Sequence, residues 1–162
     1  MMNITIIHVG QMKESYFTEA VAEYEKRLSK FCTVKNIYIK EARIDDNNVS
    51  ETEISSALEL EAENILEALP PAAKCVNIAL CIEGKLFSTE KLYDMINSAR
   101  LDSKDLCFVI GGSRGLSEQV KSKCTYRMSM SPMTFPHHLA RVMLLEQIYR
   151  CASIIQGSKY HK

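Results

Sequence analysis

Short apolar runs alternate with amphipathic stretches along the 162 residues of the chain. Runs rich in β-branched side chains predict strands, and apolar positions three and four residues apart predict helices. The predicted strands cover residues 4–9, 34–40, 75–82, 106–110 and 126–130. The predicted helices cover residues 17–31, 51–69, 89–99, 117–124 and 136–155. This alternation favours an α/β fold that forms a single domain over residues 1–162, with a mainly parallel sheet and helices on both faces.

Capping and helix-breaking residues set several of the expected boundaries. Ser50 and Glu53 match a capping box, in which each side chain accepts a hydrogen bond from the backbone N–H group of the other residue. A helix should therefore begin at this point and end at residues 70–71, which are both proline. Ser88 is expected to cap the next helix, and Gly84 predicts a turn after the third strand.

The composition, with 46% hydrophobic and 25% charged residues, is ordinary for a soluble globular protein. It excludes a disordered chain, a collagen and a disulfide miniprotein. No apolar run approaches the ~20 residues that cross a bilayer, and residues 1–9 lack the basic segment of a signal peptide. We therefore expect a cytoplasmic protein with no membrane partner. The six cysteines include no Cys-x-x-Cys pair, which indicates buried free thiols and no metal site.

Charge is distributed unevenly, although the formal net charge is zero. Residues 1–110 carry 12 Lys and Arg against 18 Asp and Glu, whereas residues 111–162 carry 8 against 2. Three of the four histidines also lie in residues 111–162. Either the two parts of the chain attract each other, or the C-terminal third faces an anionic partner.

Three segments follow predicted strands, where ligands of parallel sheets bind: residues 83–85, 111–115 and 130–135. Residues 111–115, Gly-Gly-Ser-Arg-Gly, match neither the dinucleotide-binding fingerprint nor a P-loop, so they form either a tight turn or a ligand loop. Residues 130–135, Met-Ser-Pro-Met-Thr-Phe, form an apolar loop that proline stiffens. Such a loop offers backbone groups to a flat, mostly uncharged ligand.

The start of the last helix carries His137, His138 and Arg141 and no acid. A helix N-terminus is positive, so each cation there costs about 0.3–1 kcal/mol. Arg141 also falls on the apolar stripe of Leu145 and Ile148, where a guanidinium needs an anionic partner. That partner is either a carboxylate from the acidic part of the chain or a bound or developing anion. The helix terminus should also keep a nearby histidine neutral, as a general base requires.

Together these segments resemble the RlmH family of SPOUT methyltransferases. The similarity covers nearly the whole chain and is carried by residues 4–10, 108–113, 133–137, 141–150 and 160–162. Members of this family methylate N3 of a pseudouridine in the helix 69 loop of large-subunit ribosomal RNA. The resemblance implies S-adenosylmethionine as methyl donor, no metal, a homodimer and a C-terminal trefoil knot. It also implies 23S rRNA in the assembled 70S ribosome as the substrate.

The resemblance assigns residues to the site as well. It places the cofactor against Leu80, Gly111, Met130, Ser131, Pro132, Met133, Thr134 and Phe135. Imide N3 must lose its proton to attack the methyl group, and we expect Arg141 to stabilise the resulting anion. His161, with Tyr160, should position or deprotonate the base, and His137 is a second candidate base. In a dimer, the tail of one subunit could complete the site of the other.

Two other functions fit the sequence less well. One is a ribosome-binding or assembly factor that keeps the fold without turnover. The other is a flavodoxin-type protein that binds a nucleotide or flavin, which the missing phosphate loop disfavours.

Overall fold

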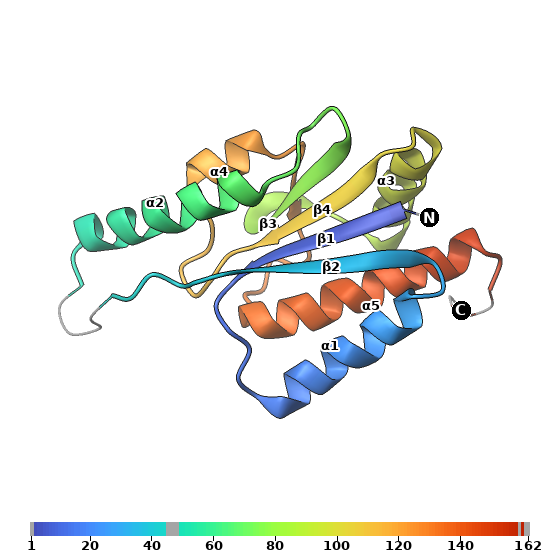
Figure 1. Ribbon diagram of the computed structural model, residues 1–162, viewed down its shortest axis with the longest axis horizontal. Helices are drawn as coiled ribbons and strands as arrows, with labels where there is room; N and C mark the ends of the chain where they lie inside the picture. Colours follow the sequence, from blue (N-terminus) through green and yellow to red (C-terminus); the bar gives the residue numbers. More distant parts are fainter. Residues whose placement is uncertain (1, 45–48, 159, 161–162) are drawn as a thin grey trace.

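Five parallel strands form one sheet in the order β2-β1-β4-β3-β5 (Figure 1). The computed structural model describes residues 2–44, 49–158 and 160. The strands are β1 (Met2–Val9), β2 (Cys32–Ile39), β3 (Cys75–Leu86), β4 (Asp105–Ile110) and β5 (Tyr126–Ser129). The helices of the described residues are α1 (Ser15–Leu28), α2 (Glu51–Ala68), α3 (Thr89–Leu101), α4 (Glu118–Lys123) and α5 (His137–Ile155). The predicted order of strands and helices is confirmed.

Helices cover both faces of the sheet (Figure 1). Helices α1, α3 and α5 pack on one face, and α2 and α4 pack on the other. Strand β4 divides its side chains between the two cores, because successive residues of a strand point to opposite faces. Phe108 belongs to the core under α5, whereas Cys107 and Val109 belong to the core under α2 and α4. All three are fully buried, so β4 is the central strand of the fold.

The predicted caps of α2 and α3 are confirmed. The backbone N–H of Glu53 donates to Ser50 Oγ at 3.2 Å, and that of Ser50 donates to Glu53 Oε2 at 2.9 Å, which completes the capping box. Helix α2 ends at Ala68, just before the two prolines. Ser88 caps α3 by accepting a hydrogen bond from the Lys91 N–H at 3.2 Å. Among the described residues, no helix combines the length and apolar character needed to cross a membrane.

The predicted turn at Gly84 is wrong, because β3 continues through Gly84 to Leu86. Both Leu80 and Lys85 pair with Met128 of β5, so the pairing shifts register between them. A Cβ atom on Gly84 would lie 2.7 Å from the carbonyl oxygen of Arg127. The glycine is therefore required for the close approach of two strands, a second common use of glycine within a strand.

Because all strands are parallel, their carboxyl ends lie at one edge of the sheet. Helix α5 begins at the same edge, with His137 as its first residue. The loops after β3, β4 and β5 also meet there. This edge carries most of the residues that the sequence singled out.

Candidate functional site

A cavity of about 810 Å³ opens at the carboxyl ends of β3, β4 and β5. Residues 80–83 of β3, the residues that follow β4 and β5, and the first turn of α5 form most of its walls. Seven of the eight predicted cofactor residues line it: Leu80, Gly111, Met130, Ser131, Met133, Thr134 and Phe135. Pro132 lies in the same loop but is not part of the lining. The volume lies in the range of small-molecule sites, about 300–1,000 Å³.

The loop after β4 brings bare backbone to the cavity. Gly115 has φ of +76°, and its N–H donates to the Gly112 carbonyl oxygen at 3.1 Å, which closes a tight turn. A Cβ atom on Gly111 would lie 2.4 Å from the carbonyl oxygen of Gly115. No other residue fits at position 111 without moving the turn. The loop is thus both a tight turn and a cavity wall.

Residues 130–135 form the apolar wall opposite the glycine turn. Ser131 orders this loop, because its carbonyl oxygen accepts a hydrogen bond from Ser129 Oγ at 3.0 Å and its Oγ accepts one from the Met133 N–H at 3.0 Å. The Met133 side chain is 69% exposed at the cavity mouth. An exposed thioether beside an ordered backbone suits a flat, weakly polar ligand.

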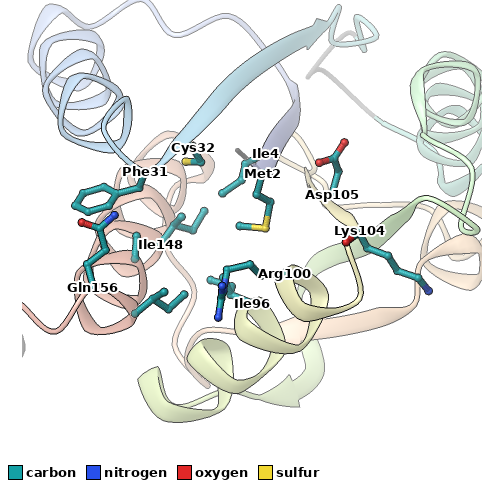
Figure 2. A pocket seen from close by; sticks show the side chains of 13 residues that line it. Met2, Ile4, Phe31, Cys32, Ile96, Arg100, Lys104, Asp105, Ile148 and Gln156 are labelled. Atoms are coloured by element: carbon teal, nitrogen blue, oxygen red, sulfur yellow. The ribbon is translucent and has the colours of Figure 1, made fainter.

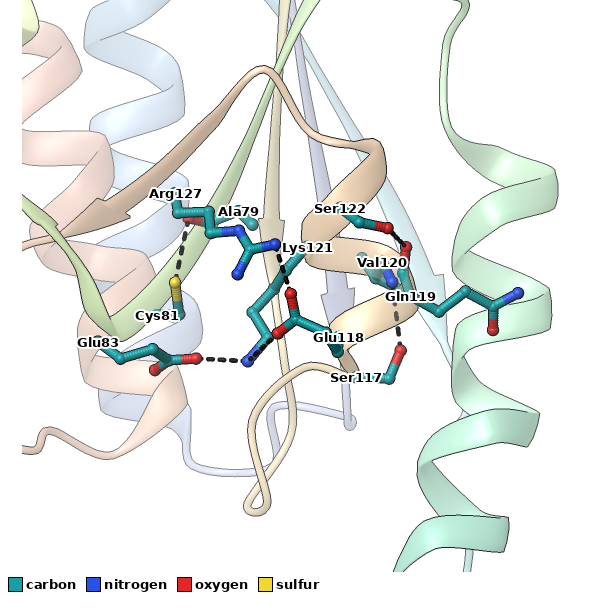
Figure 3. A network of polar contacts seen from close by, with 10 residues as sticks. All are labelled: Ala79, Cys81, Glu83, Ser117, Glu118, Gln119, Val120, Lys121, Ser122 and Arg127. Atoms are coloured by element: carbon teal, nitrogen blue, oxygen red, sulfur yellow. Dashed lines mark hydrogen bonds and ion pairs between the residues drawn. The ribbon is translucent and has the colours of Figure 1, made fainter.

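Ion pairs border the cavity where β3, α4 and β5 meet. Figure 3 shows Lys121 of α4 between Glu83 of β3 and Glu118, with Arg127 of β5 on the far side of Glu118. The Lys121 side chain is only 13% exposed, and its pairing with Glu83 raises its pKa. These pairs fix the edge of β3 against α4, so the Lys121 charge is locally compensated.

His137 is the one proposed catalytic residue among those described that lines the cavity. Its Nε2 atom is buried and has no hydrogen-bond partner within the part of the chain that the structure describes. Burial and the neighbouring His138 lower the pKa of His137, while Glu41 and Glu14 partly oppose the shift. The imidazole is therefore neutral at pH 7 and able to accept a proton.

Two residues near His137 were not identified from the sequence. His8 lies near the end of β1, and burial, together with the charge of Arg141, lowers its pKa to about 4. Glu41 follows β2, and its Oε1 atom accepts hydrogen bonds from the N–H (3.2 Å) and Oγ (2.9 Å) of Ser113. Burial opposes ionisation of Glu41, but these bonds and the nearby histidines keep its pKa below the usual value. The one feature of the sequence that could have identified His8 and Glu41 is their position near the carboxyl end of a predicted strand.

Arg141 is 8% exposed and does not line the cavity. Its Nη2 group donates to Asn36 Oδ1 at 2.8 Å and lies 3.7 Å from Glu25 Oε1. Asn36 in turn donates to Glu25 Oε1 at 2.7 Å, so three side chains of β2, α1 and α5 form one network. The Arg141 Nε atom is buried without a partner among the described residues. A carboxylate partner for Arg141 thus exists within the chain.

Tyr160 lies along the second half of α5 rather than at the cavity. Its ring meets the Tyr149 ring edge-on at a centroid distance of 4.8 Å, and the Arg150 guanidinium lies 4.9 Å from its centroid. Its hydroxyl donates to Glu146 Oε1 at 3.4 Å. His161 lies outside the described residues. Within one chain, Tyr160 does not reach His137.

A second cavity, of about 500 Å³, lies at the opposite edge of the sheet (Figure 2). Its walls are mostly apolar side chains of β1, α3 and α5, such as Ile4, Ile96 and Ile148. Arg100 and Asp105 lie at its rim. None of the proposed site residues lines it, so the cavity near His137 is the candidate site.

Residues 2–161 match the family model described as "Predicted SPOUT methyltransferase". Two similar proteins, from Clostridium botulinum strains Okra and Alaska E43, are named ribosomal RNA large subunit methyltransferase H. They are 45% and 43% identical to this chain over 162 residues, which cover 99% of this chain and 100% of each relative.

Solved structures share the fold at low sequence identity. A probable methyltransferase from Bordetella pertussis matches with a TM-score of 0.58 and 15% identity, over 92% of this chain and 93% of that one. A probable methylase family protein from Haemophilus influenzae matches with a TM-score of 0.54 and 12% identity, over 99% and 70% of the two chains. The family model and the relatives together establish that the chain belongs to the SPOUT methyltransferases and, among them, to the RlmH family.

Proposed function

We propose that this protein transfers a methyl group from S-adenosylmethionine to N3 of a pseudouridine in the helix 69 loop of 23S rRNA. The substrate is the assembled 70S ribosome. The observation that carries this proposal is the cavity of about 810 Å³, which joins seven of the eight proposed cofactor residues to a neutral His137. The relatives' name, ribosomal RNA large subunit methyltransferase H, supports the same activity.

The size of the cavity and the chemistry of its lining suit S-adenosylmethionine. At the glycine turn, a ligand can approach the backbone closely because no side chain stands in the way. Leu80, Met133 and Phe135 offer apolar surface to an adenine ring. When bound, the cofactor supplies an electrophilic methyl group on a sulfonium. The proposed reaction uses no metal.

His137 is the proposed general base. The imidazole of His137 would accept the N3 proton of the base, and the bound cofactor would supply the methyl group to N3. The place of His137 in the cavity lining and its lowered pKa, which keeps the imidazole neutral, support this role. The walls of the cavity would hold nucleophile and methyl group in line, which is a large part of the catalysis of a displacement.

Arg141, Tyr160 and His161 are proposed to complete the site. Arg141 does not line the cavity, but its buried Nε has no partner among the described residues, and we propose that this group stabilises the imide anion. Tyr160 and His161 would act on the partner subunit's cavity in a homodimer, because Tyr160 lies away from the His137 of its own chain. The trefoil knot and the cytoplasmic location that accompany this function remain predictions.

Methyl transfer to ribosomes tests the proposal directly. Incubation with S-adenosylmethionine carrying a labelled methyl group should label 23S rRNA of ribosomes that lack the modification. Ribosomes that already carry N3-methylpseudouridine are the matched control and should take up no label. A protein that co-sediments with the unmodified ribosomes but transfers no methyl group would be a binding or assembly factor instead, and the proposed activity would be wrong.

A further inference from the structure

A groove of about 490 Å³ lies beside the cofactor cavity, where the chain leaves β1 and β2. Four cationic side chains from three segments line it: Lys13 after β1, Lys40 and Arg43 after β2, and Arg114 of the glycine turn. All four residues are exposed. This cationic groove was not identified from the sequence, because its charges come mostly from the acidic first part of the chain.

The two carboxylates in the groove are engaged by the protein backbone. Glu61 is 7% exposed, and its Oε1 accepts the Ala42 N–H at 2.8 Å. Glu41 Oε1 accepts the N–H and Oγ groups of Ser113. These bonds tie the segment after β2 to α2 and to the glycine turn. Both carboxylates are thus held by groups of the protein, whereas Lys13 and Lys40 are exposed.

Tyr38 provides an aromatic surface in the same groove. Its side chain is 49% exposed, and its ring lies 5.9 Å from the His8 ring at an interplanar angle of 53°. Because the ring lines the groove, a ligand in the groove would contact it. Tyrosine rings on which nucleobases stack, set among cations that contact phosphates, are the usual elements of single-strand binding.

The groove continues into the cofactor cavity. Ser113 and Arg114 line both, so a strand lying in the groove passes the glycine turn before it reaches the cavity. Tyr38 lies near His8, which is within electrostatic range of His137. A nucleotide placed at His137 would therefore have its neighbours over this groove.

We infer that the groove holds the single-stranded RNA next to the target nucleotide, with phosphates at Lys13, Lys40 and Arg43 and one base stacked on Tyr38. The inference rests on the proposed function, because it takes the nucleotide in the cavity to be part of an RNA loop. Unpaired loops, whose bases are free to stack on aromatic side chains, are the RNA that proteins recognise most readily.

The role of the groove is tested by measuring the affinity of variants for unmodified ribosomes at several salt concentrations. The variant K13Q/K40Q should bind about tenfold more weakly, and the slope of log K against log salt should become shallower by about 0.7 for each phosphate that a lysine no longer neutralises. Tyr38→Ala should also weaken binding about tenfold, with the salt dependence unchanged. The matched control K30Q/K74Q removes two exposed lysines at the opposite edge of the sheet and should bind like the wild type. Cofactor affinity, measured by calorimetry, should be the same in all variants.

Three outcomes would overturn the inference. Groove variants that bind like the wild type, or a control pair that weakens binding equally, would remove the groove from the RNA site. Weakening by K13Q/K40Q without any effect of Tyr38→Ala would assign the groove to an acidic protein segment. The outcomes are separable from failure of the proposed function, because binding is measured without methyl transfer. A groove that binds RNA in a protein that transfers no methyl group would leave the inference standing.

Discussion

Arg141 shows why a residue's role cannot be deduced from its helix position alone. Its place on the apolar stripe of α5 predicted a buried guanidinium with an anionic partner, and the side chain is indeed 8% exposed. The sequence left two partners open, a carboxylate or a reacting anion. Glu25 is the carboxylate partner, but its Oε1 lies 3.7 Å from Arg141 Nη2, which is too far for a hydrogen bond. The short bond goes to neutral Asn36, so the charge of Arg141 is only partly compensated.

Replacing Arg141 separates catalysis from packing. If Arg141 stabilises the imide anion, Arg141→Ala should lower the single-turnover rate at saturating cofactor by about 100-fold or more, as removal of an oxyanion donor does. Asn36→Ala removes the same internal hydrogen bond and is the matched control. It should change the rate by less than about threefold, because it leaves the guanidinium in place. Equal decreases in the two variants would make Arg141 a structural residue.

Candidate site residues were predictable where a residue type was unusual for its place in the chain. Histidine at a helix N-terminus pointed to His137. Gly111 was assigned only through the family resemblance, because a glycine loop after a strand can also be just a tight turn. His8 and Glu41 could not be found this way, because a histidine in a strand or a glutamate in a loop is ordinary. Their importance arises from contacts between strand ends that only the fold creates, such as that of Glu41 with Ser113.

At the scale of elements, periodicity predicted every strand and helix among the described residues, and caps set the starts of α2 and α3. It failed at the end of β3, where glycine was interpreted as a turn. The sequence does not distinguish a glycine that bends the chain from one that admits a neighbouring strand. The distinction depends on β5, whose Arg127 carbonyl oxygen approaches Gly84. Strand β5 begins 40 residues after the end of β3, at Tyr126 against Leu86, so no local pattern reports the contact.

A side chain at position 84 should therefore disturb the pairing of β3 with β5. In Gly84→Ala the new methyl group would lie 2.7 Å from the Arg127 carbonyl oxygen and 3.0 Å from the Met128 carbonyl carbon. We expect the free energy of unfolding in urea to fall by about 1–3 kcal/mol, as in other overpacked sites. Lys85→Ala, at the neighbouring residue, is the control. Its free energy of unfolding should fall by less than half as much. If the urea midpoint of Gly84→Ala equals that of the wild type, β3 and β5 can move apart at this point without loss of stability.

At the scale of the molecule, much of the uneven charge is neutralised within the fold. Lys121 pairs with Glu83, and Arg141 lies near Glu25, so the basic and acidic parts of the chain do attract each other. Arg127 and Arg150 pair with acids of their own part, Glu118 and Glu146. The charge imbalance of the sequence therefore does not locate an RNA surface. The cationic groove is found only when segments that are distant in sequence are brought together.

The tail and the cavity are separated by the length of α5. His137 begins this helix, and Tyr160 packs on Tyr149 and Arg150 in its second half. At 1.5 Å per residue, the twelve residues from 137 to 149 span about 18 Å. Tyr160 cannot serve its own cavity from this position. If the tail of one subunit reaches its partner's cavity in a homodimer with two-fold symmetry, the other tail does the same, because both subunits use the same surfaces.

Mixed dimers test whether the site is shared. Gly111→Ala should abolish cofactor binding, since its methyl group would meet the Gly115 carbonyl oxygen at 2.4 Å, and deletion of residues 160–162 should remove the tail. Each variant alone should be inactive. When the two are co-expressed, half of the dimers are mixed, and each mixed dimer combines one intact cavity with the partner's intact tail. Activity should return to about one quarter of the wild-type value. No recovery in dimers shown by sedimentation to be mixed would place the tail in its own subunit's site, which would require Tyr160 to leave its contacts with Tyr149 and Arg150.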